Sequence, residues 1–232
     1  MDTRFWGPDG WLILHSITAN YPKKISSKYK HIYLHFFNTL EFLLPCVYCR
    51  RSFSQYVKDI PIENYLDSKK NICLWLYLIH NKVNDKLKSQ NLNHKDNPLF
   101  KTIYDRYNRY INDTKNARQI PGFKFLNSIL FNIASNINVI NKSTIYNLIK
   151  FIYLLPLVNP FTKFNDVYTE YLKRHPIENY ISTSKELKKW MYNLSLTYSL
   201  KHDIKILSYS KSCNYLEDYK SNCVKKTCRL ID

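Results

Sequence analysis

Apolar side chains recur every three or four residues over most of this chain, which is the period of one face of an α-helix. In the first half the pattern predicts five helices. The first helix has Pro8 in its first turn and ends before Pro22. The second is capped by Ser26 or Ser27 and ends before Pro45.

Three more helices are predicted before residue 112. A short one carries residues 46–57 after the proline, and a longer one is capped by Ser68 and reaches Leu87. A fifth follows a cap at Asp96 or Asn97 and runs through "LFKTIYDRYNRYI". These helices would form one domain, residues 1–111.

The second half continues the same period after a polar segment, residues 112–122, which holds a Pro-Gly pair and is predicted to be a linker. No internal repeat of solenoid length and no low-complexity block is visible. A second domain is predicted at residues 123–232, with a tail from about residue 208 and helices at 124–137, 143–155, 163–174 and 183–201.

Composition supports a folded, all-α protein. Hydrophobic residues make up 45% of 232 residues, enough for a core, and only 3 glycines appear, which disfavours a turn-rich sheet fold. The net charge of +17 divides into +8 for residues 1–110 and +9 for residues 111–232. A dedicated nucleic-acid arm is therefore disfavoured, and weak, non-specific polyanion binding is expected.

No export or membrane signal is visible. The start of the chain lacks a basic region followed by an apolar one, and the longest apolar run, "FIYLLPLV", is too short to span a bilayer. We therefore expect an intracellular protein with no membrane partner. Six cysteines in such a protein favour metal or redox chemistry over an extracellular disulfide framework.

The stretch "PCVYC" places Cys46 and Cys49 at the start of a predicted helix. Thiols in a first helical turn meet unpaired N–H groups and the positive end of the helix dipole, which favour thiolate, and Arg50 and Arg51 add positive charge. Three interpretations are open: a metal clip, a structural staple or a redox pair. Zinc would need two more ligands at usable spacing, which do not follow nearby.

Other readings of this region are weaker. His31 and His35 lie one helical turn apart before the cysteine pair, but two histidines on an exposed helix face would have the same spacing. A thioredoxin-like site would need a strand before the cysteines, where the period is helical. We expect no metal at this site.

The helix "WLYLIHNKVNDKL" places His80 and Asn84 on one face beside Val83 and Leu87. Edge hydrogen bonds and an apolar bed suit a flat heteroaromatic ligand. The alternative is a partly solvated helix face. His15 shares a stripe with a tryptophan and is open to the same two readings, a ligand contact or a core histidine.

Three segments together, "WGPDGWLILHSITANYP", "PCVYCRRSFSQY" and "WLYLIHNKVNDKL", resemble the Erv/ALR family of FAD-linked sulfhydryl oxidases, members encoded by large DNA viruses included. The resemblance covers residues 4–90 and implies an Erv-type bundle of four helices around FAD with a fifth packed across. It also implies thiol-containing protein substrates, O₂ as electron acceptor with hydrogen peroxide as product, and a homodimer. A viral member would act in the host cytoplasm and could enter the virion.

The resemblance also implies residue roles. Cys46 is the cysteine that incoming thiolates attack, and Cys49 is the one next to the flavin. The FAD-contacting positions are Gly7, Trp11, His15, Cys49, His80, Asn81, Val83, Asn84 and Lys86. A family position that usually holds a lysine is Ser89 here, and Lys86 or Lys88 is expected to replace that lysine. Two further positions differ from the family: Leu44 stands where an aromatic residue is common, and a late tryptophan is absent between residues 91 and 120.

The remaining cysteines carry lesser predictions. Cys223 and Cys228 are similar to shuttle pairs that pass electrons to a core pair. The alternative is a structural disulfide between Cys213 and one of these two cysteines, or reduced thiols. Cys73 is predicted to be a small buried hydrophobe. Two other classes of protein stay open: a basic helical nucleic-acid-binding or adaptor protein, and a zinc module.

Overall fold

The computed structural model describes residues 1–92, 95–114 and 122–221, and no strand occurs among them. The first half folds into five α-helices and one short 3₁₀ helix, as the apolar period predicts. Their bounds are α1 Thr3–Ala19, α2 Ser27–Leu43, α3 Val47–Asp59, η1 Ile62–Tyr65, α4 Lys69–Ser89 and α5 Phe100–Thr114.

The second half is also helical, which confirms the all-α class. Its elements are α6 Phe123–Ser135, α7 Lys142–Val158, α8 Thr162–Arg174, η2 Ile177–Tyr180, α9 Ser184–His202 and α10 Tyr209–Glu217. The helix α10 lies in the segment that the sequence suggested was a tail. Most of the predicted linker, residues 115–121, lies outside the described residues.

The predicted start of the first helix is wrong. Asp2 caps α1 by accepting a hydrogen bond from the backbone N–H of Arg4 at 2.7 Å, so the helix begins one turn earlier and Pro8 lies inside it. An aspartate cap satisfies one of the N–H groups that the start of any helix leaves without an intrahelical partner. As a consequence Gly7 is a helical position.

The caps of the other helices are partly as predicted. Ser26 and Ser68 cap α2 and α4 by accepting backbone hydrogen bonds. Neither Asp96 nor Asn97 caps α5, because Asp96 forms a salt bridge with Lys88 and Asn97 donates to the carboxylate of Asp85. Both side chains are thereby held on α4 rather than at the start of the fifth helix.

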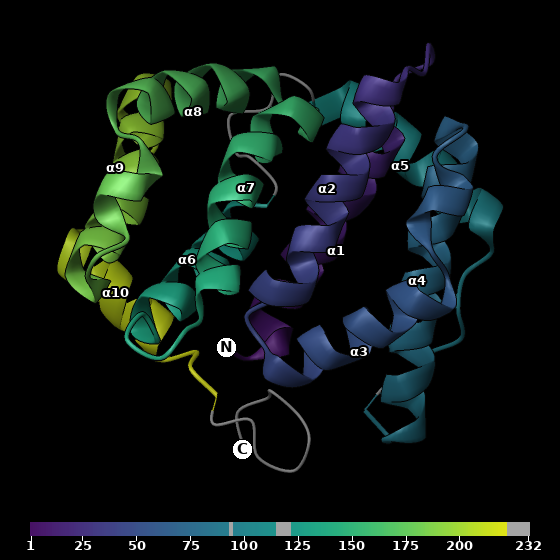
Figure 1. Cartoon of the computed structure of the whole chain (residues 1–232), viewed down its shortest axis with the longest axis horizontal. Helices are drawn as coiled ribbons and strands as arrows, with labels where there is room; N and C mark the ends of the chain where they lie inside the picture. The colour runs from purple at the N-terminus through teal and green to yellow at the C-terminus, as the bar shows by residue number, and fades with distance from the viewer. Residues whose placement is uncertain (93–94, 115–121, 222–232) are drawn as a thin grey trace.

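Four helices form the centre of the molecule. In Figure 1, α1, α2, α6 and α7 lie in the middle, with α3 and α4 on one side and α8 and α9 on the other. One apolar core runs through both halves, and in it the buried rings of Phe36 and Phe151 stack with centroids 5.3 Å apart. The two predicted domains therefore share a core.

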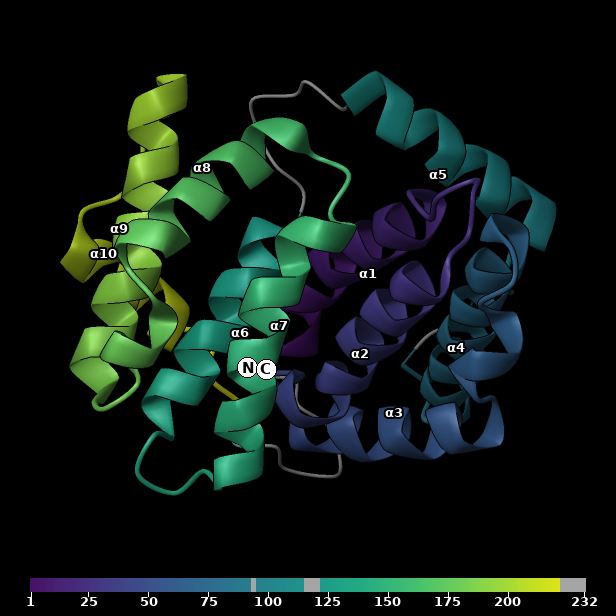
Figure 2. The ribbon, with the colours of Figure 1, turned by 45° about the horizontal axis from the view of Figure 1, so that its top comes forward.

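The fifth helix packs across the first half. Helix α5 crosses α1 and α4 (Figure 2) and buries Tyr107 and Ile111 against them. This is the arrangement of four helices and a fifth that the resemblance implies. No helix within the described residues is long and apolar enough to cross a membrane.

Candidate redox and ligand-binding site

Cys46 is the cap of helix α3. Its backbone is extended, and its Sγ accepts a hydrogen bond from the backbone N–H of Cys49 at 3.1 Å. The two thiols are therefore neighbours at the positive end of a helix, where the sequence predicts them, and no disulfide joins them in this structure. Cys46 is 2% exposed and Cys49 is half-buried.

A cleft lies beside Cys46. It has a volume of ≈ 370 Å³, and we call it the Cys46 cleft. Its first wall holds the start of α3 with Arg50, whose Nη1 donates to the carbonyl of Leu44 at 2.6 Å. The opposite wall comes from the second half of the chain, with side chains that include Asn132, Ile133, Asn136, Val139, Ile140 and Thr144.

Cys49 does not line the cleft, and it shares a face of α3 with Ser52 and Tyr56, both of which contact α4. Its neighbour Tyr56 donates its hydroxyl hydrogen to the carbonyl of Lys82 at 3.3 Å. Burial raises the pKa of Tyr56, and the nearby charges of Asp59, Asp85 and Cys49 add to that rise. The two cysteines thus point to different neighbours, one to the cleft and one toward α4.

Four aromatic rings form a row across α1, α4 and α5. The ring of Trp11 stacks on His80 with centroids 3.8 Å apart, and His15 stacks on Tyr107 at 4.6 Å. A hydrogen bond of 3.0 Å between His15 Nε2 and His80 Nδ1 joins the two stacks. The structure therefore brings together three residues that the sequence singled out separately.

Burial keeps both histidines uncharged. It lowers the pKa of His80 to about 4 and that of His15 well below its usual 6.5, with the charges of His80 and Arg106 lowering His15 further. At neutral pH one ring N–H must therefore donate to the bare nitrogen of the other ring. His15 is a core histidine, and it is also part of the candidate site.

The predicted ligand stripe on α4 is partly exposed. His80, Asn81, Val83, Asn84 and Lys86 are all half-buried, whereas Trp75, Leu76 and Ile79, nearer the start of the helix, are fully buried. The first part of α4 therefore belongs to the core, and the part from His80 onward is partly accessible to a ligand.

The polar residues of the stripe contact neighbouring segments. Asn84 Nδ2 donates to Asn97 at 2.9 Å, and Lys86 Nζ donates to Ser52 of α3 at 2.7 Å. Lys88 is exposed and forms a salt bridge with Asp96 at 2.7 Å. Lys86 is therefore the better placed of the two candidate lysines to contact a ligand, because it links the predicted ligand stripe on α4 to α3, the helix of Cys46 and Cys49.

The other predicted positions are Gly7 and the cysteines outside the pair. A side chain at Gly7 would meet nothing within 4 Å, so the surface beside α1 is open there. Cys73 is buried, and burial raises its pKa to about 11, which confirms an inert core thiol. Cys213 is half-buried, and Cys223 and Cys228 lie outside the described residues.

The structure adds two features that the sequence analysis missed. Tyr107 supports His15, and the signal was the four-residue spacing of Ile103, Tyr107 and Ile111 on α5. The far wall of the Cys46 cleft was not foreseen either, since it lies about 90 residues further along the chain. Among the described residues no three Cys, His, Asp or Glu side chains gather as a metal site would require.

The first half of the chain is similar to known proteins. Residues 8–107 match the model of the Erv1 / Alr family. A probable FAD-linked sulfhydryl oxidase of Acanthamoeba polyphaga mimivirus is 33% identical over 85 residues, 36% of this chain and 59% of the relative. The mitochondrial FAD-linked sulfhydryl oxidase of Saccharomyces cerevisiae is 30% identical over 87 residues, 38% of this chain and 45% of the relative.

A third relative is a putative FAD-linked sulfhydryl oxidase of Invertebrate iridescent virus 3, 26% identical over 107 residues, 46% of this chain and 68% of that protein. The chain thus spans about half the length of the first two relatives. No solved structure matches.

Proposed function

We propose, on the premise that residues 8–107 carry the Erv1 / Alr family domain, that this protein is an FAD-dependent sulfhydryl oxidase that forms disulfide bonds in protein substrates. One observation carries the proposal beyond the comparisons. The two cysteines share a helix start, yet Cys46 lines a cleft and Cys49 lies toward α4. A pair that relays electrons from a thiol to a cofactor needs these two directions.

The residues around α1 and α4 fit FAD. Trp11 and His80 offer flat, partly exposed rings, Val83 an apolar contact, and Asn81 and Asn84 amides for the edge of a heteroaromatic ring. The space beside Gly7 has room for a group larger than hydrogen. Lys86 supplies a cation near Ser52 for the diphosphate.

The cysteines perform the thiol chemistry. A substrate thiolate attacks Cys46 Sγ of the Cys46–Cys49 disulfide, which forms a mixed disulfide and releases Cys49 as thiolate. A second substrate thiolate then attacks the substrate sulfur and releases Cys46. Two substrate thiols have become one disulfide, and the cysteine pair now holds the two electrons.

The helix α3 favours the second of these steps. Its N-terminal N–H groups and Arg50 stabilise negative charge on Cys46 when that residue leaves. Cys49 is then placed to hand the electrons on. When bound, FAD supplies the transfer of these two electrons from the pair to O₂, giving hydrogen peroxide.

The purified protein should be yellow and should consume oxygen with a dithiol. Replacing Cys49 by serine should lower turnover at least ~1,000-fold, a loss of roughly 4 kcal/mol of transition-state stabilisation, because the relay to the cofactor is broken. The measurement is oxygen uptake with dithiothreitol beside the visible absorbance spectrum. Cys73→Ser is the matched control, since Cys73 is a buried thiol outside the site.

The proposal fails if the protein is colourless after supplying FAD, or if Cys49→Ser turns over like the wild type. A colourless protein that binds DNA with a steep salt dependence would instead support the basic adaptor alternative, given the net charge of +17.

We also propose a second route, in which Cys223 and Cys228 take electrons from folded proteins whose thiols do not enter the Cys46 cleft and pass them to Cys46. The support is positional: Ser221, the last described residue, lines the Cys46 cleft. The double variant Cys223→Ser/Cys228→Ser should slow oxidation of a reduced protein at least ~5-fold and leave dithiothreitol oxidation within about twofold, because a small dithiol reaches Cys46 directly. Equal rates with the reduced protein would show that the tail cysteines are not a shuttle.

A further inference from the structure

The second half of the chain repeats the first. Helices α7, α8, η2 and α9 each begin 115 residues after α2, α3, η1 and α4, so that Ser27 corresponds to Lys142 and Lys69 to Ser184. The pentapeptide "PIENY" occurs at residues 61–65 and again at residues 176–180, at the same offset. We call α1 to α4 the first copy and α6 to α9 the second copy.

The same internal hydrogen bond occurs in each copy. Trp75 Nε1 donates to the carbonyl of Ile60 at 2.9 Å, and Trp190 Nε1 donates to the carbonyl of His175 at 2.9 Å, which is the same bond 115 residues later. Both tryptophans are fully buried. A matching buried bond at matching positions indicates one structural unit used twice.

The copies pack on each other around a pseudo-twofold axis. In an isologous contact, residues near the axis meet their own counterparts. Phe36 stacks on its counterpart Phe151, and His35 Nδ1 lies 3.4 Å from Nζ of its counterpart Lys150. Figure 1 shows the result, with α3 and α4 placed opposite α8 and α9 across α2 and α7.

The second copy has lost the chemistry of the first. Phe161 and Phe164 stand where the first copy has Cys46 and Cys49, and both rings are buried. Ser195 and Leu196 stand at the positions of His80 and Asn81. The second copy therefore has no thiol pair and lacks this part of the ligand stripe.

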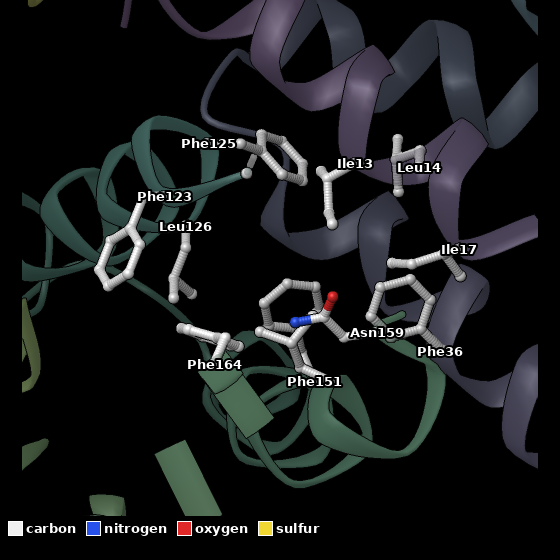
Figure 3. Close-up of a pocket in the computed structure, with 12 residues that line it drawn as sticks. Ile13, Leu14, Ile17, Phe36, Phe123, Phe125, Leu126, Phe151, Asn159 and Phe164 are labelled. Carbon is white, nitrogen blue, oxygen red and sulfur yellow. The ribbon is translucent and has the colours of Figure 1, made fainter. Parts of the chain in front are cut away.

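Two cavities lie between the copies. Near the start of α8, side chains that include Phe164, Ile13 and Ile17 leave a cavity of ≈ 20 Å³ (Figure 3). The Cys46 cleft of ≈ 370 Å³ lies between the start of α3 and the end of α6, and only its residue Asn132 has a counterpart, Ile17, in the small cavity.

We infer that the second copy is a degenerate duplicate whose retained role is to form the far wall of the Cys46 cleft, where it holds a thiol-bearing segment of a protein substrate in extended form. The inference rests on the proposed function for the substrate class. One chain then completes its own site, and no second chain is needed to supply the wall.

The chemistry of the wall matches this occupant. Asn132, Asn136 and Thr144 offer amide and hydroxyl groups, which pair with the backbone of an extended peptide, while Ile133, Val139 and Ile140 offer apolar contacts for its side chains. The cleft volume lies within the range of ligand sites, roughly 300–1,000 Å³.

Trapping a peptide on Cys46 tests the wall without flavin or oxygen. The full chain carrying Cys49→Ser, so that Cys46 is not resolved, is reduced and mixed with a cysteine peptide activated as its pyridyl disulfide. The Cys46 thiolate attacks the peptide sulfur, the peptide–pyridyl S–S bond breaks, a Cys46–peptide disulfide forms and pyridine-2-thione leaves with the electron pair. Mass spectrometry confirms the site of modification.

Val139→Trp, at a residue 81% exposed, should lower the trapping rate at least ~5-fold and leave alkylation of Cys46 by iodoacetamide within about twofold, because only the larger reagent needs the wall. Asn136→Trp, also exposed, should do the same. Leu200→Trp on α9 is the control, 75% exposed and outside the cleft. Unchanged trapping, or an equal loss with both reagents, overturns the inference. Trapping by the Cys49→Ser protein beside a wild type that oxidises no thiol overturns only the proposed function.

Discussion

At the scale of single residues, the bond between His15 and His80 joins two helices through uncharged rings. Burial disfavours the charged form of each ring, so neither takes up a proton at the pH where an exposed histidine would. The same property makes these histidines suitable beside a redox cofactor, because their charge does not change near neutral pH.

The histidine pair should make stability depend on pH. As pH falls below 6.5 the unfolded chain takes up a proton at His80, whereas the folded chain does so only near its pKa of about 4, so stability is lost as pH falls through this window. We expect the free energy of unfolding to drop by about 2 kcal/mol between pH 7 and pH 5 from this residue. Urea unfolding followed by tryptophan fluorescence measures it.

The variant His80→Gln keeps an amide for His15 and removes the titrating group, so its stability should change by about half as much or less over the same pH range. His31→Gln, on the exposed face of α2, serves as the control. A wild-type slope that survives in His80→Gln would contradict the assignment.

At the scale of elements, the contact between α2 and α7 holds the two copies together. Phe36 and Phe151 are each 1% exposed and meet at the pseudo-twofold axis. Each of these rings is buried by a helix of the other copy, so the contact contributes to the stability of both copies.

Single Phe36→Leu and Phe151→Leu variants should each lower the free energy of unfolding by about 1–2 kcal/mol. The double variant should lose less than the sum, with a coupling of about 0.5–1.5 kcal/mol, because the second change removes a ring whose partner is already absent. Urea unfolding of all four proteins gives the cycle.

The control cycle pairs Phe36→Leu with Phe100→Leu, since Phe100 packs in a separate cluster under α5. That cycle should be additive. Additivity between Phe36 and Phe151 as well would show that the two halves of the chain fold independently.

At the scale of the whole molecule, the repeat explains why residues 123–202 carry no visible catalytic motif. Their pattern is that of a second helical unit whose chemistry has been replaced by phenylalanine and leucine. The expectation of a homodimer stays a prediction, and the pairing that the structure shows is between two copies within one chain.

The sequence by itself determined the helices, the position of Cys46 and Cys49 at a helix start, and the position of His80, Val83 and Asn84 on α4. These depend on local features: the period of apolar residues, the capping side chains and the spacing of residues on one helix face. The prediction that Pro8 lies in the first turn was wrong because Asp2, six residues earlier, caps the helix.

Only the tertiary structure decided which of these elements meet. The bond between His15 and His80 joins residues 65 positions apart, and the Cys46 cleft needs a wall from α6 and the segment after it. No local pattern encodes such contacts, because they depend on how the helices pack. The sequence shows the repeat in the pentapeptide "PIENY". Only the reciprocal contacts show that the repeat is a second copy packed against the first.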